Sequence, residues 1–466
     1  MRNPAVPPDG DTIAAVSTPF GVGGIGIVRM SGKDAEKVLR RLFVPKRPRT
    51  FFPSHRLCYG TIRNPQDATL VDEALVAVMR APRTYTREDM VEIQCHGGAV
   101  PVRRVLELVL VEGVRLAGPG EFTRRAFLNG RIDLAQAEAV LDTVAAKSET
   151  ALRLAQRQLA GCTSRAIEAI RERVRNLLVE VEAWLDFPEE DLPDPEWSRW
   201  RGDIAGQAEA ARRLLETYRD AHWLRDGVTV VIGGKPNAGK STLLNVLVGR
   251  ERAIVSATPG TTRDFLEEAL LIGGIPVRLV DTAGIHESLE EVEAQGVARA
   301  RGQIRAADLV LWVVDVSGPG EEWAPGTLEG VPEERTILVL NKIDLVAGPE
   351  LDRLGPGLPA LPQVLVSARH GRGIEELRGA ILSRLSTDQM DLDSRVVITN
   401  LRHRQVLDRC LEALRRAEGQ FEFAAPPGDL LAQDLRQALR ALGEVLGETT
   451  PEEILQRIFE SFCVGK

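Results

Sequence analysis

The sequence lacks the features that define several protein classes. No run of 18 or more apolar residues occurs in its 466 residues, which argues against a membrane-spanning helix. The five cysteines are scattered and form no C-x-x-C pair, which argues for a reduced, cytoplasmic compartment and against a structural zinc site. The start of the chain, Met1–Gly10, is rich in proline and unlike a signal peptide. We therefore expect a cytoplasmic protein without a membrane segment.

Charge is unevenly distributed along the chain. The formal net charge of −8 disfavours a surface that binds nucleic acid over its whole extent. Two local basic clusters nevertheless occur. They comprise Arg40, Arg41, Lys46, Arg47 and Arg49 in the first, and Arg124, Arg125 and Arg131 in the second. Because most such clusters are solvated surface, we expect the same of these two.

The most informative segment is Gly234–Ser241, which reads G-K-P-N-A-G-K-S. It fits the phosphate-loop pattern G-x-x-x-x-G-K-[S/T] and lies between an apolar strand, Val228–Ile232, and a helix-forming run, Thr242–Val248. The loop backbone, including Asn237, Ala238 and Gly239, is expected to point N–H groups at a phosphate. Lys240 would contact the β- and γ-phosphates, and the Ser241 hydroxyl would bind Mg²⁺. A purely structural glycine loop is the alternative.

Two further segments fit the Mg²⁺ side of such a site. A short apolar strand, Val277–Val280, runs into Asp281-Thr282-Ala283-Gly284, where the Asp would hold the Mg²⁺ water shell and the Gly N–H would reach the γ-phosphate. Between the motifs lies a loop with a threonine, Thr262, suited to a second Mg²⁺ contact. The nucleotide-binding residues expected in this loop are Ser256, Ala257, Thr258, Pro259, Gly260, Thr261 and Thr262. A simple polar turn is the alternative.

The base-binding motifs indicate guanine. The strand Ile337–Leu340 ends in Asn341-Lys342-Ile343-Asp344, and Val364–Val366 ends in Ser367-Ala368-Arg369. The Asp344 carboxylate can accept hydrogen bonds from the N1–H and the exocyclic amine of guanine, a pair of donors that adenine lacks. Four ordered motifs at strand ends resemble the Ras-like GTPase superfamily, which predicts that the chain binds GTP.

The sequence departs from the Ras pattern after Gly284. Ile285 stands where Ras-like enzymes carry the glutamine that orients the attacking water, and no arginine finger is identifiable. Carboxylates in the segment Glu287–Glu293 could orient water instead, or they could form a solvated acidic face. A monovalent cation bridging the phosphates could supply the missing charge, with the side-chain oxygen of Asn237 as a ligand.

The remaining sequence predicts a multidomain fold. Residues 1–121 mix strands (Thr12–Val16, Ile25–Met30, Glu73–Met79, Met90–Gln94) with helical stretches (Asp34–Leu42, Val100–Glu112), which indicates an α+β N-terminal domain. Apolar residues at three- and four-residue spacing predict helices in 122–223, including one long segment, Glu149–Asp186, and again in 387–466. The two helical parts are expected to form one discontinuous all-α domain, interrupted by a Ras-like α/β P-loop GTPase domain at 224–386.

The whole chain resembles the MnmE (TrmE) family of tRNA wobble-uridine modification GTPases. Several segments outside the GTPase motifs carry this resemblance. They are Asp11–Ala15, Gly23–Arg29, Glu92–Gly98, Pro119–Thr123, Arg124–Gly130, Asp133–Ala139 and the terminal Cys463-Val464-Gly465-Lys466. The resemblance implies work with the flavoprotein MnmG, adding an aminomethyl or carboxymethylaminomethyl group to C5 of the wobble uridine of certain tRNAs. It also implies a one-carbon unit from 5,10-methylenetetrahydrofolate, for which 5-formyltetrahydrofolate is an analogue.

The resemblance also implies roles for single residues. Arg29, Glu92, Arg131 and Lys466 would bind the folate, although Arg29 and Glu92 could simply pair across a sheet, and Arg131 stands where many relatives carry Lys. K⁺ would be bound by Asn237 and the loop residues Ser256, Thr258 and Thr261. Glu293 would orient the attacking water through a bridging water, beside Lys240 in the catalytic site. Cys463 matches the family's terminal cysteine, needed for the modification. Dimerisation would occur through the N-terminal domain.

Two other classes of protein compete with this interpretation. A ribosome-assembly GTPase would use the same nucleotide motifs but append an RNA module such as a KH domain with a G-x-x-G loop. The segment after Leu385 is helical and has no such loop, which counts against it. A structural scaffold with a degenerate GTPase is opposed by the intact Lys240, Ser241, Thr262, Asp281 and Asp344.

Overall fold

The structure of the protein, a computed structural model, describes residues 10–19, 21–186, 196–249, 267–281, 302–318, 331–346, 361–385, 396–422 and 426–466. The chain divides into two compact units. The first comprises Met1–Leu141, Gln158–Ile167 and Arg440–Lys466, and the second comprises Asp142–Arg157 and Glu168–Leu439. Among the described residues, no helix combines the length and apolar character needed to cross a membrane.

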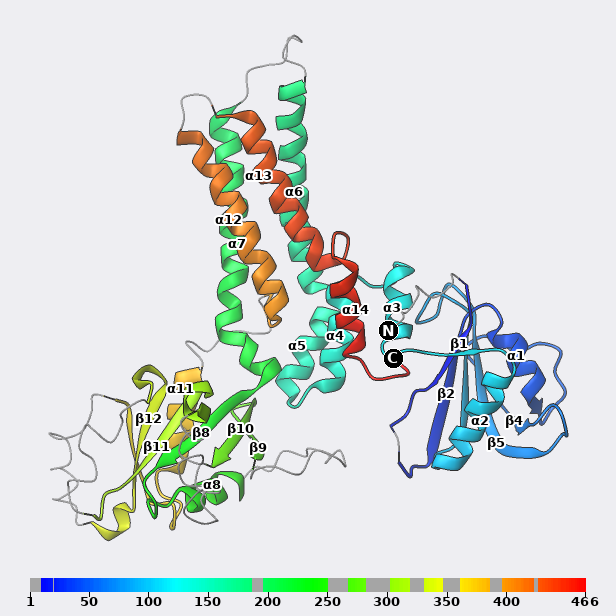
Figure 1. The fold of residues 1–466 in the computed structure, drawn as a ribbon, viewed down its shortest axis with the longest axis horizontal. Helices are drawn as coiled ribbons and strands as arrows, with labels where there is room; N and C mark the ends of the chain where they lie inside the picture. Colours follow the sequence, from blue (N-terminus) through cyan, green and yellow to red (C-terminus); the bar gives the residue numbers. More distant parts are fainter. Residues whose placement is uncertain are drawn as a thin grey trace. The chain divides into compact units, whose positions relative to one another are not determined.

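The first unit is built on a seven-stranded sheet with the order β3-β4-β5-β6-β2-β1-β7 (Figure 1). Neighbouring strands are antiparallel except β1 and β7. The strands are β1 Ile13–Val16, β2 Ile25–Ser31, β3 Phe43–Pro45, β4 Leu57–Arg63, β5 Leu70–Met79, β6 Met90–His96 and β7 Arg115–Leu116. The four strands expected from the sequence are confirmed, whereas β3, β4 and β7 were not predicted.

Two helices, α1 (Ala35–Leu42) and α2 (Ala99–Val111), pack on one face of this sheet. Their apolar residues, such as Leu39 and Val105, share a core with the inward side chains of the strands, such as Ile93. Alternation along the strands sends every second side chain to the opposite face. That face leaves Leu57, Tyr59 and Leu75 exposed.

The C-terminus of the chain returns to the first unit. Helices α3 (Glu121–Leu128), α4 (Leu134–Ala145) and α14 (Glu452–Glu460) meet there. A small core joins them, made of Leu134, Ala137, Leu455, Phe459 and Phe462. Beyond α14, Val464 forms an antiparallel bridge with Pro119. The last four residues are therefore part of the N-terminal fold.

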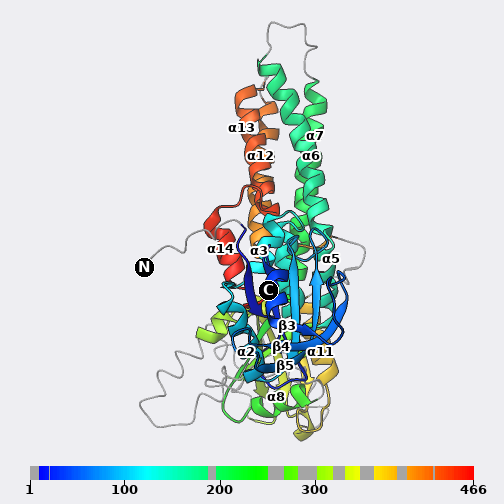
Figure 2. The same cartoon turned by 90° about the vertical axis from the view of Figure 1, so that its right-hand side faces the viewer.

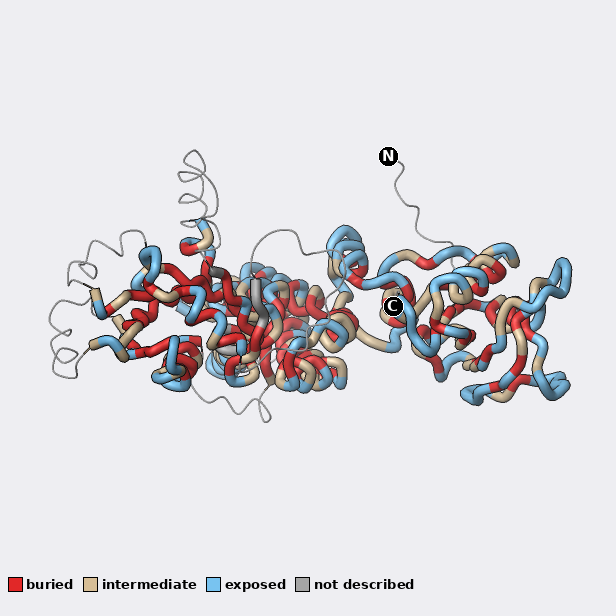
Figure 3. Tube along the Cα trace, turned by 90° about the horizontal axis from the view of Figure 1, so that it is seen from below, coloured by how far each residue is buried: buried red, intermediate tan, exposed pale blue. Residues whose placement is uncertain are grey.

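The second unit contains a six-stranded sheet with the order β13-β12-β11-β8-β10-β9, parallel except for β9. Its strands are β8 Val228–Gly234, β9 Glu267–Ile272, β10 Ile275–Asp281, β11 Leu309–Asp315, β12 Thr336–Asn341 and β13 Gln363–Val366, with helices α8 (Lys240–Gly249) and α11 (Ile374–Leu385). Most residues of β8, β11 and β12 are buried. Buried residues are drawn in red in Figure 3. The strand before each nucleotide motif is confirmed, and β9 and β11 are additional.

Most of the length of four long helices belongs to the second unit. α6 (Cys162–Asp186), α7 (Trp197–Asp226), α12 (Leu401–Gly419) and α13 (Gly428–Leu446) run side by side (Figures 1 and 2). The segment predicted as one long helix over 149–186 is two, α5 (Glu149–Leu159) and α6. The chain breaks at Gly161, whose φ of 83° is left-handed and ends a helix.

These elements confirm the predicted fold class. The protein is multidomain, with an α+β N-terminal domain, a discontinuous helical domain and an inserted Ras-like α/β P-loop domain. The residue boundaries given for the domains stay predictions. The acidic segment 187–195 lies outside the described residues.

Candidate functional site

The phosphate loop connects β8 to α8, as its sequence predicts. Gly239 has a φ of 93°, and a Cβ at this position would lie 2.3 Å from the Asn341 side-chain nitrogen. Asn237 also has a left-handed backbone, with φ 63°. Its side chain is exposed and makes no hydrogen bond to the described residues. The loop therefore needs glycine at 239 and presents the Asn237 carboxamide outward.

Lys240 begins α8 and points its ammonium back into the loop. Nζ donates to the carbonyl oxygens of Gly234 at 3.0 Å and Lys235 at 2.8 Å, and the residue is buried. Such an arrangement holds a positive charge at a helix N-terminus, where backbone N–H groups also converge. The loop and Lys240 together can therefore bind phosphate oxygens.

Asn341 joins three segments of the site. Its side-chain Nδ2 donates to the carbonyl oxygen of Ala238 at 2.9 Å, and its Oδ1 accepts from the backbone N–H of Ala368 at 3.0 Å. The residue is buried, so both hydrogen bonds are shielded from water. The phosphate loop and the loops after β12 and β13 are thus held together by one side chain.

The carboxylate of Asp344 is held in place by a hydrogen bond from Ser367. The Ser367 hydroxyl donates to its Oδ1 at 2.6 Å, and this bond lowers the pKa of the Asp344 carboxyl. The imidazole Nε2 of His370 lies 3.6 Å from Oδ2. Ser367 and Asp344, predicted from separate motifs, are therefore brought together.

The sequence analysis missed Asp315, which holds Lys342 in place. Lys342 has a left-handed φ of 67°, and its Nζ lies 2.5 Å from Asp315 Oδ2. Burial acts to raise the pKa of Asp315, but hydrogen bonds from Lys342 and Ser317 outweigh it, and the pKa is lowered. The available signal was an Asp at the end of an apolar strand, β11, which is the neighbour of β12, the strand that ends just before Lys342.

Several predicted nucleotide residues lie outside the described residues. These are Ser256, Ala257, Thr258, Pro259, Gly260, Thr261, Thr262, Thr282, Ala283, Gly284 and Glu293. The backbone of Asp281 is described, and it ends β10 beside Ile232 of β8. The roles predicted for the residues outside the described ranges, in binding nucleotide and metal ions, stay predictions.

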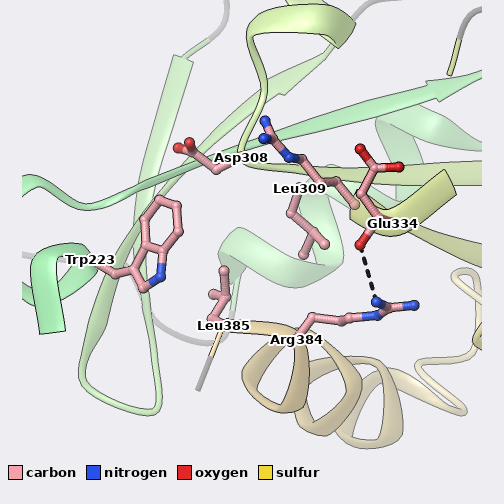
Figure 4. A pocket seen from close by; sticks show the side chains of 7 residues that line it. Trp223, Asp308, Leu309, Glu334, Arg384 and Leu385 are labelled. Carbon is pink, nitrogen blue, oxygen red and sulfur yellow. Dashed lines mark hydrogen bonds between the residues drawn. The ribbon is translucent and has the colours of Figure 1, made fainter. Parts of the chain in front are cut away.

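A cavity of about 260 Å³ lies apart from these motifs (Figure 4). Trp223 near the end of α7, Leu309 and Leu385 line it, and Arg384 donates to the carbonyl oxygen of Glu334 at 3.1 Å. Among the described residues, none of those predicted to bind GTP lines this cavity. It is therefore distinct from the candidate nucleotide site.

In the first unit, Arg29 and Glu92 form an ion pair across the sheet. They are register partners on β2 and β6, with Arg29 Nε 2.9 Å and Nη2 2.8 Å from Glu92 Oε1. Arg29 Nη1 also donates to the carbonyl oxygen of Gly465 at 3.3 Å. The pair is thus a structural element of the sheet and at the same time a contact to the C-terminal tail.

The tail Cys463–Lys466 is anchored by backbone contacts. The Ser17 hydroxyl donates to the Gly465 carbonyl at 3.2 Å, and the Phe122 N–H donates to the Lys466 carbonyl at 3.2 Å. Cys463 is exposed. Burial lowers the pKa of the Lys466 ammonium, an effect that Cys463 opposes and the Arg29 charge reinforces. Arg29 is therefore in contact with the backbone of the tail that carries Cys463 and Lys466.

Arg131 contacts the segment that carries Thr84 and Tyr85. Its Nη1 donates to the Thr84 carbonyl at 2.6 Å, and its guanidinium carbon lies 5.1 Å from the centre of the Tyr85 ring. Burial raises the pKa of Tyr85, against the charges of Arg131 and Arg29. Arg29 lies 5.8 Å from the centre of the Phe122 ring. Each of these two aromatic rings therefore has one of the predicted cations over it.

The basic cluster that contains Arg124 and Arg125 is not solvated surface, so the expectation from the sequence is wrong here. Arg125 is buried and pairs with Asp11, with Glu88 at 3.0 Å and with Glu121 at 3.2 Å. Its neighbour Arg124 pairs with Glu452 at 2.7 Å. Glu121 lies one helical turn before Arg125, a spacing visible in the sequence, whereas Asp11 and Glu88 are distant in the sequence and gave no signal. This network fixes the start of α3, whose backbone receives the tail.

The chain matches two family models and many proteins along their full length. Residues 12–131 match the GTP-binding protein TrmE N-terminus, and residues 134–463 match the MnmE helical domain. The tRNA modification GTPase MnmE of Carboxydothermus hydrogenoformans is 46% identical over 98% of this chain and 99% of its own length. That of Moorella thermoacetica is 47% identical with the same coverage. Among solved structures, the G domain of the T. maritima FeoB iron transporter is 29% identical, covering 34% of this chain and 98% of that chain with a TM-score of 0.25.

Proposed function

The chain belongs to the MnmE family of tRNA modification GTPases, and from this premise we propose its full reaction. It hydrolyses GTP and, with the flavoprotein MnmG, adds an aminomethyl or carboxymethylaminomethyl group to C5 of the wobble uridine of certain tRNAs. The one-carbon unit comes from 5,10-methylenetetrahydrofolate bound in the first unit. The proposed reaction is tested by measuring these modified uridines in tRNA from cells that lack the chain, where we expect them to be lost.

The docked C-terminal tail is the observation that carries this proposal. It brings Lys466 and Cys463 to a site with Arg29, Glu92 and Arg131, around the rings of Tyr85 and Phe122. A folate offers a flat pterin ring with N–H donors and a negatively charged glutamate tail. Aromatic faces, a carboxylate and several cations match these groups. The residues present therefore fit the cofactor, which would supply the carbon that is transferred.

Within this site the residues divide by chemistry. Glu92 gives Oε1 to Arg29, so Oε2 is the oxygen that would accept from the pterin N–H groups. Arg29, Arg131 and Lys466 would bind carboxylates and keep the site positive. Burial lowers the pKa of the Lys466 ammonium. Cys463 lies exposed beside it.

The nucleotide site would work as in other P-loop GTPases. Lys240 and the N–H groups of the phosphate loop would bind the phosphates, while Ser241, Thr262 and Asp281 would hold Mg²⁺ directly or through water. Asp344 and the Ser367–Arg369 backbone would bind guanine. Glu293 would orient the attacking water, since Ile285 cannot.

The structure supports a place for K⁺ as well. Asn237 turns an unbonded carboxamide outward from a left-handed position in the phosphate loop. Its oxygen, with Ser256, Thr258 and Thr261, would hold a monovalent cation against the phosphates. The positive charge would offset charge that develops during hydrolysis, in place of an arginine finger.

We expect GTP turnover to be at least about tenfold faster in K⁺ than in Na⁺, because a fitted cation stabilises the transition state. Asn237→Gly should lose this difference, since glycine accepts the left-handed backbone but carries no oxygen ligand. Asn237→Asp is the matched control, and it should keep the K⁺ response. Steady-state phosphate release in the two salts measures this. Equal wild-type turnover in both salts would exclude the cation site.

The exposed face of the N-terminal sheet supports a homodimer. Leu57, Tyr59 and Leu75 place apolar surface on adjacent strands β4 and β5, on the face opposite α1 and α2. A second copy of this chain would bury that surface. MnmG and tRNA would complete the assembly in the cytoplasm. The ribosome-assembly alternative gains nothing from the structure, because the described segment after α11 is helical.

A further inference from the structure

One basic segment is not used by the proposed reaction. Between Glu36 and Asp67 the sequence contains no Asp or Glu, although the chain as a whole has a net charge of −8. Its cations include Lys46, Arg47, Arg49 and Arg56, all in the loop that joins β3 to β4. Such a segregation of charge within an acidic protein indicates a local anionic partner.

The structure ties this loop to a second basic segment, residues 80–87. Arg80 Nη1 donates to the Phe52 carbonyl at 2.8 Å, and the His55 imidazole Nε2 lies 2.8 Å from the Arg83 carbonyl oxygen. The 80–87 segment adds Arg83 and Arg87 without a carboxylate. The two loops therefore form one continuous basic surface.

The cations of this surface fall into two groups. Arg40 and Arg80 are paired with Glu36, and Arg41 is paired with Glu112. In contrast, the side chains of five exposed cations have no hydrogen-bond or ion-pair partner within the described part of the chain. These five, called the basic patch from here on, are Lys46, Arg47, Arg49, Arg56 and Arg83. Their charges are available to an external ligand.

An exposed aromatic ring lies within the same loop. Phe51 is 60% exposed, and the Arg80 guanidinium carbon lies 4.5 Å from its ring centre. Unpaired cations bind phosphates, and an exposed ring stacks on unpaired bases. An acidic protein would satisfy the cations but would leave no role for the ring. The combination therefore favours RNA.

The basic patch is connected to the candidate folate site by one loop. Arg83 precedes Thr84, whose carbonyl accepts from Arg131, and Tyr85, whose ring faces the same arginine. We propose that the basic patch binds the phosphate backbone of the tRNA substrate and guides it toward this site. The inference rests on the proposed function, because a uridine substrate must approach the one-carbon donor.

A triple variant of the full chain, Arg47→Gln/Arg49→Gln/Arg83→Gln, tests the proposal. The matched control is Arg103→Gln/Arg104→Gln/Arg213→Gln, which removes the same charge from exposed arginines elsewhere. The probe is an unmodified tRNA transcript, titrated by fluorescence anisotropy at several salt concentrations. Circular dichroism and thermal unfolding of each variant report whether the protein is folded.

We expect the triple variant to bind tRNA about tenfold or more weakly, with the slope of log affinity against log salt reduced by roughly 2 to 3. The control should bind like the wild type, and the triple Arg→Lys variant should recover most of the affinity because phosphate contacts need charge rather than a planar fork. Unchanged binding by the Gln variant, or an equal loss in the control, would overturn the proposal. Binding of the wild type to anionic lipid vesicles, lost in the Gln variant while tRNA binding persists, would overturn it in favour of a membrane.

Failure of this inference is distinguishable from failure of the proposed function. If only the basic patch is wrong, the Gln variant still restores modified uridines in cells that lack the chain. If the proposed function is wrong, those cells keep their modified uridines whatever is expressed.

Discussion

Asp344→Asn should weaken GTP binding by roughly a thousandfold or more, since a site built to hydrogen-bond a base loses that much when a partner is removed. The carboxylate, held by Ser367 at 2.6 Å, would accept from both guanine donors. A carboxamide offers one acceptor and one donor, so its NH₂ would face a guanine N–H. Xanthine has an oxygen in place of the exocyclic amine, and the variant should therefore bind xanthosine triphosphate better than GTP. Equilibrium titration with both nucleotides measures the change.

Ser367→Ala is the control for this switch. It removes the hydroxyl that orients Asp344 but leaves both carboxylate oxygens, so GTP affinity should fall by a smaller factor and the preference for guanine should remain. If Asp344→Asn binds GTP like the wild type, then Asp344 does not contact the base.

Gly465→Ala should abolish tRNA modification while GTP turnover continues. Gly465 has a φ of 96°, and a Cβ there would lie 2.2 Å from the Val16 carbonyl oxygen. The left-handed backbone alone costs a residue with a Cβ about 1–2 kcal/mol, and the contact with backbone cannot relax by moving a side chain. The tail is held by a few hydrogen bonds, each contributing about 0.5–1.5 kcal/mol. Alanine should therefore displace Cys463 and Lys466 from the site.

The control for this change is Val464→Ala, at the exposed neighbouring position. It should leave the tail docked and modification near the wild-type level, as read by nucleoside mass spectrometry of tRNA from complemented cells. Full modification with Gly465→Ala would show that the docked tail is not required. Loss of GTP turnover in the same variant would show that the effect is not confined to the first unit.

The sequence predicted best where a motif and a strand coincide. β8, β10, β12 and β13 each lie where an apolar run precedes a nucleotide motif. The structure joins the motifs after β12 and β13 by hydrogen bonds from Ser367 to Asp344 and from Ala368 to Asn341. β4 was missed because its sequence, with Gly60 and Thr61, alternates weakly in hydrophobicity. The spacing of apolar residues predicted one continuous helix over 149–186, but Gly161 divides this segment into α5 and α6.

Contacts between distant residues were beyond sequence reasoning. Asp315 and Lys342 meet because β11 and β12 are neighbours in a parallel sheet, which no local pattern reveals. Arg125 pairs with Asp11 and Glu88, which precede β1 and β6, and with Glu121 of α3. Ser17 forms a hydrogen bond with Gly465, although the two residues lie near opposite ends of the sequence. The resemblance to a family placed Arg29, Glu92, Arg131 and Lys466 in one site. The structure adds the backbone contacts that bring Lys466 there.

The most direct measurement is nucleoside mass spectrometry of bulk tRNA from cells that lack the chain, with and without its re-expression. The account predicts that aminomethyl-type groups at C5 of uridine disappear without the chain and return when it is restored. Unchanged modified uridines in the deficient cells would contradict a role in tRNA modification, and a GTP-driven switch acting on RNA or on assembly would then be the better explanation.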